Sequence, residues 1–438
     1  MLSQEDNDYL CHIGPGTPMG AFMREYWVPA VLSDELPTPD CAPLRVRLLG
    51  EDLIAFRVTS GKVGLVQNSC PHRGASLFFG RNEEQGLRCV YHGWKFDLAG
   101  QCVDMPNEPA ESNFKQKIKA VAYPCVERNG IIWTYMGSRG TPPPLPDFEA
   151  NMLGEGSYDI SIIHRPCNWM QGWEGEMDTV HQAFLHNGAV KVADTTPDTL
   201  DYYIARTPAP LFSVVETEFG TSYGAWRPAD DDTYYWRIAH MLFPFYAMIP
   251  TGAIGHEVRF AAYVPMDDTH TLHWEIAARL NNDAELPTWA RRPQGRGGPA
   301  NRPRDLFLPN TSDWYGRFNT RQNWDNDYEI DRDAQRNWKS YTGIAGIRQQ
   351  DMAVTESMGA IMDRTKEHLG TTDALIIRTR RKLIASARAL AEQGTIPPGV
   401  DSPEVYRQRS GGVVLPREQG WWDGTAELRG RFSEAAVR

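Results

Sequence analysis

The stretch that decides the fold is Cys70-Pro-His-Arg-Gly-Ala-Ser-Leu77, followed by Cys89-Val-Tyr-His-Gly-Trp-Lys-Phe-Asp97. Each segment supplies one thiolate and one imidazole, and sixteen residues separate His72 from Cys89. A structural zinc site more often takes two cysteines from one knuckle and its other two ligands from another. One Cys and one His from each loop instead suit a two-iron cluster in which the cysteines hold one iron and the histidines the other. This Rieske [2Fe–2S] arrangement is the favoured interpretation, and structural zinc is the alternative.

Short strand-like runs surround these two segments, which indicates a small all-β domain. Glycine, aspartate or serine bounds each run, as expected of short antiparallel strands. The runs cover residues 44–49, 53–58, 63–66 and 130–136. The Pro-rich segment Thr141–Asp147 is typical of a stiff linker, so we predict two domains, residues 1–148 and 149–438.

The second domain is predicted to be α+β. Strand-like stretches occur at 202–206, 234–240, 256–264 and 271–276, and helical patterns at 168–184, 351–368 and 373–393. We therefore expect an antiparallel-sheet catalytic domain with flanking helices, in a helix-grip-like arrangement. The Arg-rich segment 291–304 is interpreted as a surface loop, with docking of an acidic partner as the less favoured reading.

Composition excludes several classes of protein. The 438 residues include 45 Lys plus Arg and 56 Asp plus Glu, a net charge of −11, which works against a nucleic-acid-binding surface. No apolar run reaches the roughly 18 residues of a membrane span. The acidic N-terminus does not resemble a signal peptide, so a cytoplasmic location is expected. Of the seven cysteines, the five other than Cys70 and Cys89 have no ligand-type spacing.

The segment Asp178-Thr-Val-His181-Gln-Ala-Phe-Leu-His186 is a second candidate metal site. Asp178 and His181 would share a helix face, but His181 and His186 are five residues apart, or about 140° on an ideal helix. Both histidines reach one metal only if the helix widens or ends there. Histidines this close together are often plain surface residues, so the spacing alone leaves the question open.

The chain resembles the Rieske domain of ring-hydroxylating oxygenase α subunits. Residues 70–77 and 89–97 carry the resemblance, together with Asp104-Met-Pro106, and the phthalate dioxygenase branch is most similar. The resemblance begins at Gly14-Pro-Gly-Thr-Pro-Met-Gly20 and continues to near the C-terminal end. It implies that Cys70, His72, Cys89 and His92 hold the [2Fe–2S] cluster.

The same resemblance implies a mononuclear Fe(II) held by His181, His186 and a distant carboxylate, a 2-His-1-carboxylate set. The family places that carboxylate at the Asp of a Gln-Asp or Glu-Asp pair, which maps onto Asp351. Glu356 and Asp363 stay open as alternatives. Asp178 would be a bridging carboxylate between His181 and the cluster ligand His92 of a neighbouring subunit.

The substrate implied by the resemblance is an aromatic acid, and its carboxylate needs a cation. Arg206 and Arg237 are the candidates, with His240 nearby. The apolar stretch Met241–Tyr246 lacks the second arginine expected for phthalate. This departure favours a monocarboxylate or a larger methoxylated or aryl-linked acid.

The predicted function is that of a terminal oxygenase using O2 and electrons from a separate NAD(P)H-dependent flavin and iron–sulfur reductase. Cis-dihydroxylation of a phthalate- or benzoate-like acid is the first choice, and O-demethylation of a methoxylated aromatic acid is the alternative. A Rieske electron carrier without oxygenase activity is the rival from another class. The resemblance also implies a homotrimer or a hexamer of stacked trimers.

Overall fold

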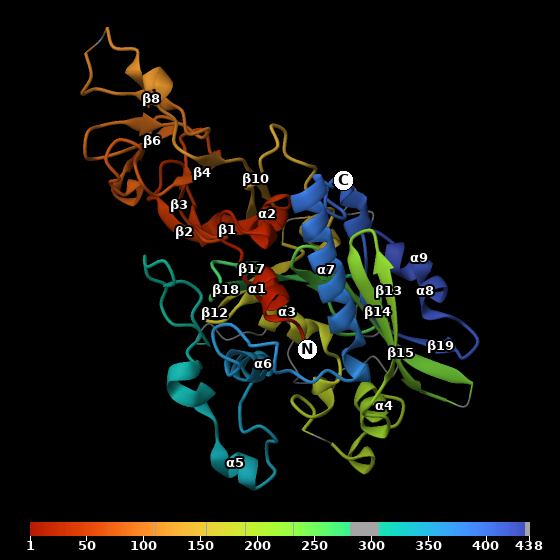
Figure 1. The fold of residues 1–438 in the computed structure, drawn as a ribbon. Helices are drawn as coiled ribbons and strands as arrows, with labels where there is room; N and C mark the ends of the chain where they lie inside the picture. Colours follow the sequence, from red (N-terminus) through yellow and green to blue (C-terminus); the bar gives the residue numbers. More distant parts are fainter. Residues whose placement is uncertain (110, 155, 189, 231, 281–305, 434–438) are drawn as a thin grey trace.

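The computed structural model describes residues 1–109, 111–154, 156–188, 190–230, 232–280 and 306–433. Within these residues, three small antiparallel sheets form the amino-terminal part and one eight-stranded antiparallel sheet organises the remainder (Figure 1). The Arg-rich segment 291–304, expected to be a surface loop, lies outside the described residues.

The amino-terminal sheets have the strand orders β1-β11-β10, β2-β3-β4-β9 and β5-β6-β7-β8. Two helices precede them. The bounds are α1 Gln4–Cys11, α2 Pro18–Arg24, β1 Trp27–Leu32, β2 Leu44–Leu48, β3 Glu51–Arg57, β4 Val63–Gln67, β5 Arg81–Glu83, β6 Gly86–Arg88, β7 Lys95–Phe96, β8 Cys102–Asp104, β9 Ala122–Tyr123, β10 Cys125–Arg128 and β11 Ile131–Tyr135.

The large sheet has the order β12-β18-β17-β16-β15-β14-β13, and β19 pairs with β15 beyond the short β16. Its strands are β12 Asp159–Arg165, β13 Leu211–Thr217, β14 Gly220–Pro228, β15 Thr233–Leu242, β16 Tyr246–Met248, β17 Glu257–Pro265, β18 Thr271–Arg279 and β19 Gly411–Pro416. The described helices are α3 Trp169–Met177, α4 Leu200–Arg206, α5 Arg332–Arg336, α6 Ile347–Glu356, α7 Ala374–Gln393, α8 Trp421–Gly424 and α9 Ala426–Gly430.

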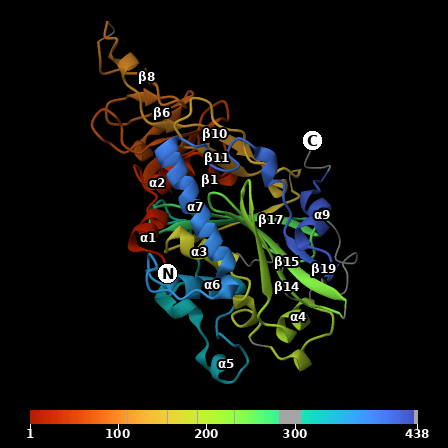
Figure 2. The ribbon, with the colours of Figure 1, turned by 45° about the vertical axis from the view of Figure 1, so that its right-hand side comes forward.

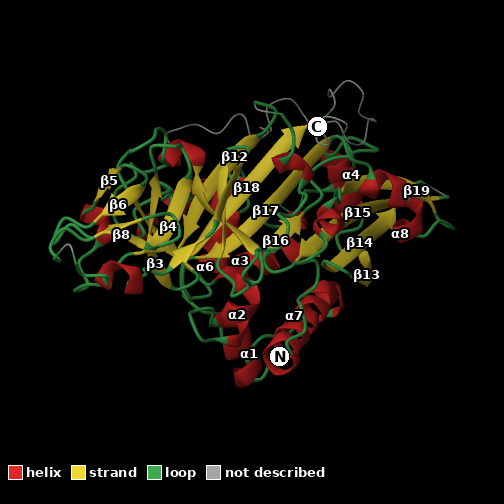
Figure 3. Ribbon diagram, turned by 90° about the horizontal axis from the view of Figure 1, so that it is seen from above, coloured by secondary structure: helices red, strands yellow, loops and turns green. Residues whose placement is uncertain are grey.

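The helices cover the large sheet unevenly. Seen from above, α1, α2 and α7 lie together on one side of the sheets (Figure 3). Helix α7 packs on α2 and β14, while α3 packs between β17 and α6 (Figure 2). The arrangement confirms the predicted α+β class: a β-rich amino-terminal domain followed by an antiparallel sheet with flanking helices.

The predicted strands of the small domain are present as β2, β3, β4 and β11, and those at 234–240, 256–264 and 271–276 lie in β15, β17 and β18. The strand predicted at 202–206 is wrong, because residues 200–206 form helix α4. The side chain of Thr199 accepts from the backbone N–H of Tyr202 and caps this helix, so local capping outweighs the β propensity of the aromatic residues.

The helix predicted for 351–368 is also wrong in its bounds. Helix α6 runs from Ile347 to Glu356, so Asp351 lies in its middle. Just beyond Glu356 some backbone groups bond to Gln171 of α3 in place of a helical partner. The Gln171 amide donates to the carbonyls of Thr355 and Gly359 and accepts from the N–H of Met362. By contrast, the predicted helix at 373–393 is confirmed as α7, which ends at the left-handed Gly394.

Buried side chains hold the amino-terminal part and the large sheet together. The main hydrophobic core runs from α1 and α2 through β11 to the large sheet, and Phe148 stacks on Phe260 with ring centroids 4.1 Å apart. A second core belongs to the β5–β8 region and includes Cys70, Cys89 and Trp94. The boundary at residue 148 stays a prediction.

Candidate metal centres

The Cys-x-His loop at residues 70–72 and the Cys-x-x-His loop at residues 89–92 have the same backbone hydrogen-bond pattern. The N–H of Cys70 donates to the carbonyl of Ala75 and that of Gly74 to Cys70, at 2.8 and 2.9 Å. In the second loop the N–H of Cys89 donates to Trp94 and that of Gly93 to Cys89, at 2.8 and 3.0 Å. Both glycines have left-handed backbone, with φ of 75° and 79°. The fold therefore presents two equivalent loops, one after β4 and one between β6 and β7.

The loops bring their ligand-type side chains together. Cys70 and Cys89 are 3% and 2% exposed, and the Cys89 thiol is among the groups that raise the pKa of Cys70, after burial itself. The rings of His72 and His92 meet edge to face with centroids 4.5 Å apart, and Trp94 stacks on His72 at 4.4 Å. The cysteines thus face the interior of the small domain.

This donor set fits a [2Fe–2S] cluster better than one zinc ion. Nδ1 of His72 is buried without a hydrogen-bond partner in the described structure, as expected of an atom that binds a metal. A tetrahedral zinc ion needs its four donors close to one point. Among the described residues, a group of three donors all within 4.8 Å of one another is found at His181, His186 and Asp351 and not in these two loops.

The second centre is built where helix α3 ends. Asp178 is the C-terminal cap of α3, with extended backbone, and its Oδ1 accepts from the N–H of Val180 at 2.7 Å. His181 begins a short 3-10 turn at residues 181–183. The helix predicted at 168–184 therefore ends at Met177, before both histidines and not just after them, and this early end frees both rings from helical spacing.

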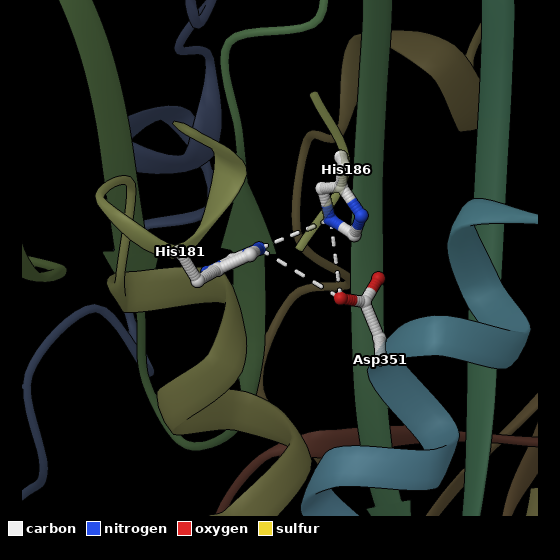
Figure 4. A group of neighbouring side chains, drawn as sticks. All are labelled: His181, His186 and Asp351. Atoms are coloured by element: carbon white, nitrogen blue, oxygen red, sulfur yellow. Dashed lines mark hydrogen bonds and ion pairs between the residues drawn. The ribbon is translucent and has the colours of Figure 1, made fainter. Parts of the chain in front are cut away.

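His181, His186 and Asp351 converge from two separate segments, the turn after α3 and the middle of α6 (Figure 4). Nε2 of His181 lies 3.1 Å from Nε2 of His186. Oδ1 of Asp351 lies 3.7 Å from the first nitrogen and 3.2 Å from the second. Two imidazoles and one carboxylate that approach a common centre from one side form the donor set of a non-haem Fe(II) site with open positions.

Outer hydrogen bonds orient both rings. Nδ1 of His181 lies 3.5 Å from Oδ2 of Asp178, and Nδ1 of His186 lies 2.9 Å from Oε1 of Gln350. The Gln350 amide nitrogen donates to Thr342 and Ile344, so its oxygen is left to accept from His186. Each Nδ1 is thus the protonated nitrogen, and each Nε2 offers its lone pair to a metal.

The charges agree with this orientation. Burial raises the pKa of Asp178, but the hydrogen bond and charge of His181 outweigh it and hold the pKa below its ordinary value. Burial lowers the pKa of His181, yet the hydrogen bond to Asp178 and the charge of Asp351 leave the pKa above its ordinary value. The site therefore carries surplus negative charge, which a divalent cation would offset.

The alternative third ligands lie elsewhere. The carboxylate of Glu356 is buried in an ion pair, 2.8 Å from Nε of Arg165, and also accepts from Tyr328. Asp363 pairs with Lys366 at 2.9 Å on the surface. Of the three carboxylates considered from the sequence, Asp351 alone joins the two histidines.

The three candidate substrate residues are not brought together. Arg206 is exposed on α4, where its Nη1 donates to the carbonyl of Ala229. The His240 ring contacts Ser222 Oγ and the Arg409 carbonyl at 2.8 and 3.2 Å, and burial lowers its pKa to about 3. Arg237 is buried, and its Nε donates to Thr179 Oγ1 at 2.9 Å, directly after Asp178.

His240 and Arg237 also point to opposite faces of the sheet. They are three residues apart on β15, and side chains alternate along a strand. Thr179 and Gln350 were not predicted from the sequence as functional residues. Their positions directly beside Asp178 and Asp351 are the signal by which they could have been found.

In the part of the chain that the structure describes, no helix is long and apolar enough to cross a membrane.

Comparison with known proteins matches both halves of the chain. Residues 26–124 match the Rieske [2Fe-2S] domain family, and residues 134–430 match the LigXa C-terminal domain like family. The chain is 44% identical to the 3-chlorobenzoate-3,4-dioxygenase oxygenase subunit of Comamonas testosteroni, covering 96% of this chain and 97% of that protein. It is 35% identical to the phthalate 4,5-dioxygenase oxygenase subunit of Pseudomonas putida, over 89% and 87%. It is also 32% identical to the 5,5'-dehydrodivanillate O-demethylase oxygenase subunit of a Sphingobium strain, over 95% and 86%.

Proposed function

The chain belongs to the Rieske non-haem iron oxygenase α subunits, and on this premise we propose that it hydroxylates an aromatic carboxylate as the terminal oxygenase of a multicomponent system. The observation that carries the proposal is the convergence of His181, His186 and Asp351 in the same chain as two paired Cys/His loops. An electron carrier without oxygenase activity would need the loops alone, so the convergence works against that rival.

Each of the two metal centres would be held by its own set of residues. Cys70, Cys89, His72 and His92 would hold the cluster, and the second centre would hold Fe(II). When bound, the cluster would supply electrons one at a time and the Fe(II) would supply dioxygen activation. The chain's own part is to keep each Nε2 unprotonated toward the iron through the hydrogen bonds made by Asp178 and Gln350.

The electron route is proposed to cross a subunit boundary. Sheet β5–β8, beside the cluster loops, lies at one end of the molecule, well away from α3 and α6 (Figure 1). Asp178 ends α3 with one oxygen toward His181, and we place His92 of a neighbouring subunit beside it. For this arrangement we propose a homotrimer or a hexamer of stacked trimers.

Electrons come from a reductase, which the oxygenase-subunit family requires. We propose an NAD(P)H-dependent flavin and iron–sulfur protein, because no nucleotide-binding fingerprint occurs in this sequence. The cytoplasmic location stays a prediction.

For the substrate we propose a benzoate-like acid and a cis-dihydrodiol product, in line with the relative named for 3-chlorobenzoate. O-demethylation of a methoxylated aromatic acid is the second candidate, and the similarity to an O-demethylase subunit supports it. Both reactions use the same two metal centres.

The test combines metal content with turnover. Purified protein should contain three irons and two acid-labile sulfides per chain, with the red-brown absorbance of a Rieske centre. A panel of benzoates and methoxybenzoates is then assayed for substrate-dependent O2 uptake with a reductase and NADH. Product analysis separates a dihydrodiol from a phenol plus formaldehyde. Two irons per chain and no O2 uptake with any acid would contradict the proposal in favour of an electron carrier.

A further inference from the structure

The segment that follows strand β8 packs directly on the second cluster loop. It covers Asp104–Asn107 and includes the Asp-Met-Pro stretch noted in the sequence. An added Cβ at Gly93 would lie 2.6 Å from Cγ of Pro106, so there is no space between the segment and the loop. Nη1 of Arg88 donates both to the carbonyl of Gly93 and to Oδ2 of Asp104, each at 2.7 Å. The segment is therefore fixed to the loop at residues 89–93.

The last residue of this segment holds the indole ring of Trp94. Nε1 of Trp94 donates to Oδ1 of Asn107 at 2.7 Å. An indole N–H can only donate, so the Asn107 amide presents its oxygen to it. Trp94 is 3% exposed, whereas Asn107 lies on the surface. An exposed amide thus anchors one edge of a buried ring.

The anchored indole lies flat against His72. The two ring centroids are 4.4 Å apart and the planes differ by 11°. Nδ1 of His72, buried without a hydrogen-bond partner in the described structure, is the atom expected to bind iron. The ring of His92 instead lies 3.9 Å from that of Tyr91, which is 54% exposed. The two histidines therefore differ, because a buried ring supports His72 and an exposed ring lies beside His92.

A stacked indole affects how readily a bound cluster would accept an electron. Reduction adds one negative charge to the cluster and its ligands. The face of an aromatic ring carries partial negative charge, which disfavours this addition. The ring also keeps water away, and water would stabilise the added charge. Both effects lower the reduction potential, so a ring held against His72 makes the cluster harder to reduce.

We propose that Asn107 and Trp94 form a positioning pair that lowers the reduction potential of the Rieske cluster through His72. Asn107 acts through the indole and not by contact with a cluster ligand. A lower potential makes a reduced cluster a stronger electron donor, so the pair favours onward electron transfer. This inference rests on the cluster assignment in the proposed function and adds the residues that set the potential.

The experiment is a redox titration of the purified holoenzyme at pH 7, followed by the visible circular dichroism of the cluster, without reductase or substrate. Trp94→Phe removes the N–H and shrinks the ring, and should raise the equilibrium constant for one-electron reduction about 10-fold, or about 59 mV. Asn107→Leu keeps the indole but releases its edge, and should raise the constant about threefold. Asn113→Leu is the matched control, because Asn113 is exposed on the same stretch and forms no helix-capping bond. The control should match wild type.

The double variant Trp94→Phe/Asn107→Leu tests whether Asn107 acts through the indole. Without the N–H there is nothing for Asn107 to hold, so the double variant should have the potential of Trp94→Phe alone. The electron paramagnetic resonance spectrum of the reduced cluster gives a second readout. Its g values should shift in both single variants, because the His72 ring loses its fixed orientation, and should stay unchanged in Asn113→Leu.

The outcomes separate this proposal from the proposed function. Wild-type potential in Asn107→Leu, with full Rieske absorbance, would overturn the positioning pair while the oxygenase function stands. Additive shifts in the double variant would overturn it too, because Asn107 would then act independently of the indole. If Trp94→Phe loses its cluster, Asn107→Leu decides alone; cluster loss from Asn107→Leu would show a role in assembly instead, and also overturns the proposal. A wild-type protein without a Rieske cluster would instead remove the proposed function itself.

Discussion

Nδ1 of His186 lies 2.9 Å from the side-chain oxygen of Gln350, the residue directly before Asp351. One helix turn therefore supplies both a candidate iron ligand and the group that orients another. The Gln350 amide is itself fixed by Thr342 and Ile344, so it cannot rotate freely to offer its nitrogen instead.

Replacing Gln350 by Leu should weaken iron binding at the mononuclear site about 10- to 100-fold, because the His186 ring loses the bond that sets its tautomer. Chelator competition on protein carrying the Rieske cluster measures this affinity directly. Gln335→Leu, on exposed helix α5, is the matched control. Equal iron affinity in the two variants would contradict the role of Gln350 in orienting His186.

Asp351→Asn should affect iron binding, whereas Glu356→Gln should affect the stability of the fold. Asp351→Asn should lose the mononuclear iron and keep the Rieske absorbance and the fold. Glu356→Gln leaves the buried Arg165 without its partner and should lower the free energy of unfolding by about 3–5 kcal/mol while iron is retained. Metal analysis and denaturant titration on both variants check this. Iron loss confined to Glu356→Gln would reverse the assignment.

Asp178→Asn should leave both metals bound and stop NADH-driven product formation. The change removes a negative charge between the two centres but keeps a group of the same size. Stopped-flow measurement of cluster reoxidation with substrate and O2 should show the loss at electron transfer. Asp363→Asn, an exposed carboxylate, is the control. Full activity in Asp178→Asn would exclude the bridge.

The two loop glycines should not tolerate alanine equally. Both have left-handed backbone, which costs a substituted residue about 1 kcal/mol. At Gly74 an added Cβ meets open space, whereas at Gly93 it would lie 2.6 Å from Cγ of Pro106. Gly93→Ala should therefore lose more of the Rieske absorbance than Gly74→Ala. A larger loss in Gly74→Ala would contradict this reading of the loops.

Asp267 links the two parts of the chain and should make the free energy of unfolding depend on pH in the acidic range. It accepts from Arg47 of β2 and from Tyr315, at 2.8 and 2.6 Å. Burial raises its pKa, but these bonds and those from His270 and Thr269 hold it well below the ordinary value. A lowered folded-state pKa means that the stabilisation is full above about pH 5 and declines as the pH falls through the unfolded and then the folded pKa.

Asp267→Asn should therefore lower the unfolding free energy by about 1–3 kcal/mol at pH 7. The difference from wild type should shrink toward pH 3. Urea titrations at pH 7, 5 and 3.5 measure it, with exposed Asp333→Asn as the control. A difference that does not change with pH would exclude the charge of Asp267 as its cause.

Much of the fold and of the metal residues could be predicted from the sequence. The strands of the small domain follow local alternation of side chains, and helix α7 has its own stop at Gly394. The error at 202–206 was local, because the Thr199 cap favours a helix there, whereas the error at 351–368 involves a distant group. Beyond Glu356, the side chain of Gln171, nearly two hundred residues earlier, bonds the Gly359 carbonyl and the Met362 N–H.

The sequence by itself determined where most of the candidate ligands lie, because ligand type and short spacing along one loop are local properties. Cys70 with His72, Cys89 with His92, and His181 with His186 are all within five residues of each other. Only the tertiary structure decided between Asp351 and Glu356, since both lie on one helix and differ in what the rest of the fold places beside them. It also separated the three candidate substrate residues, because Arg237 bonds Thr179 beside Asp178, whereas Arg206 is exposed on α4 and His240 faces the other side of the sheet. Sheet register sets which face a side chain occupies, and register is fixed by pairing between strands that the sequence does not show.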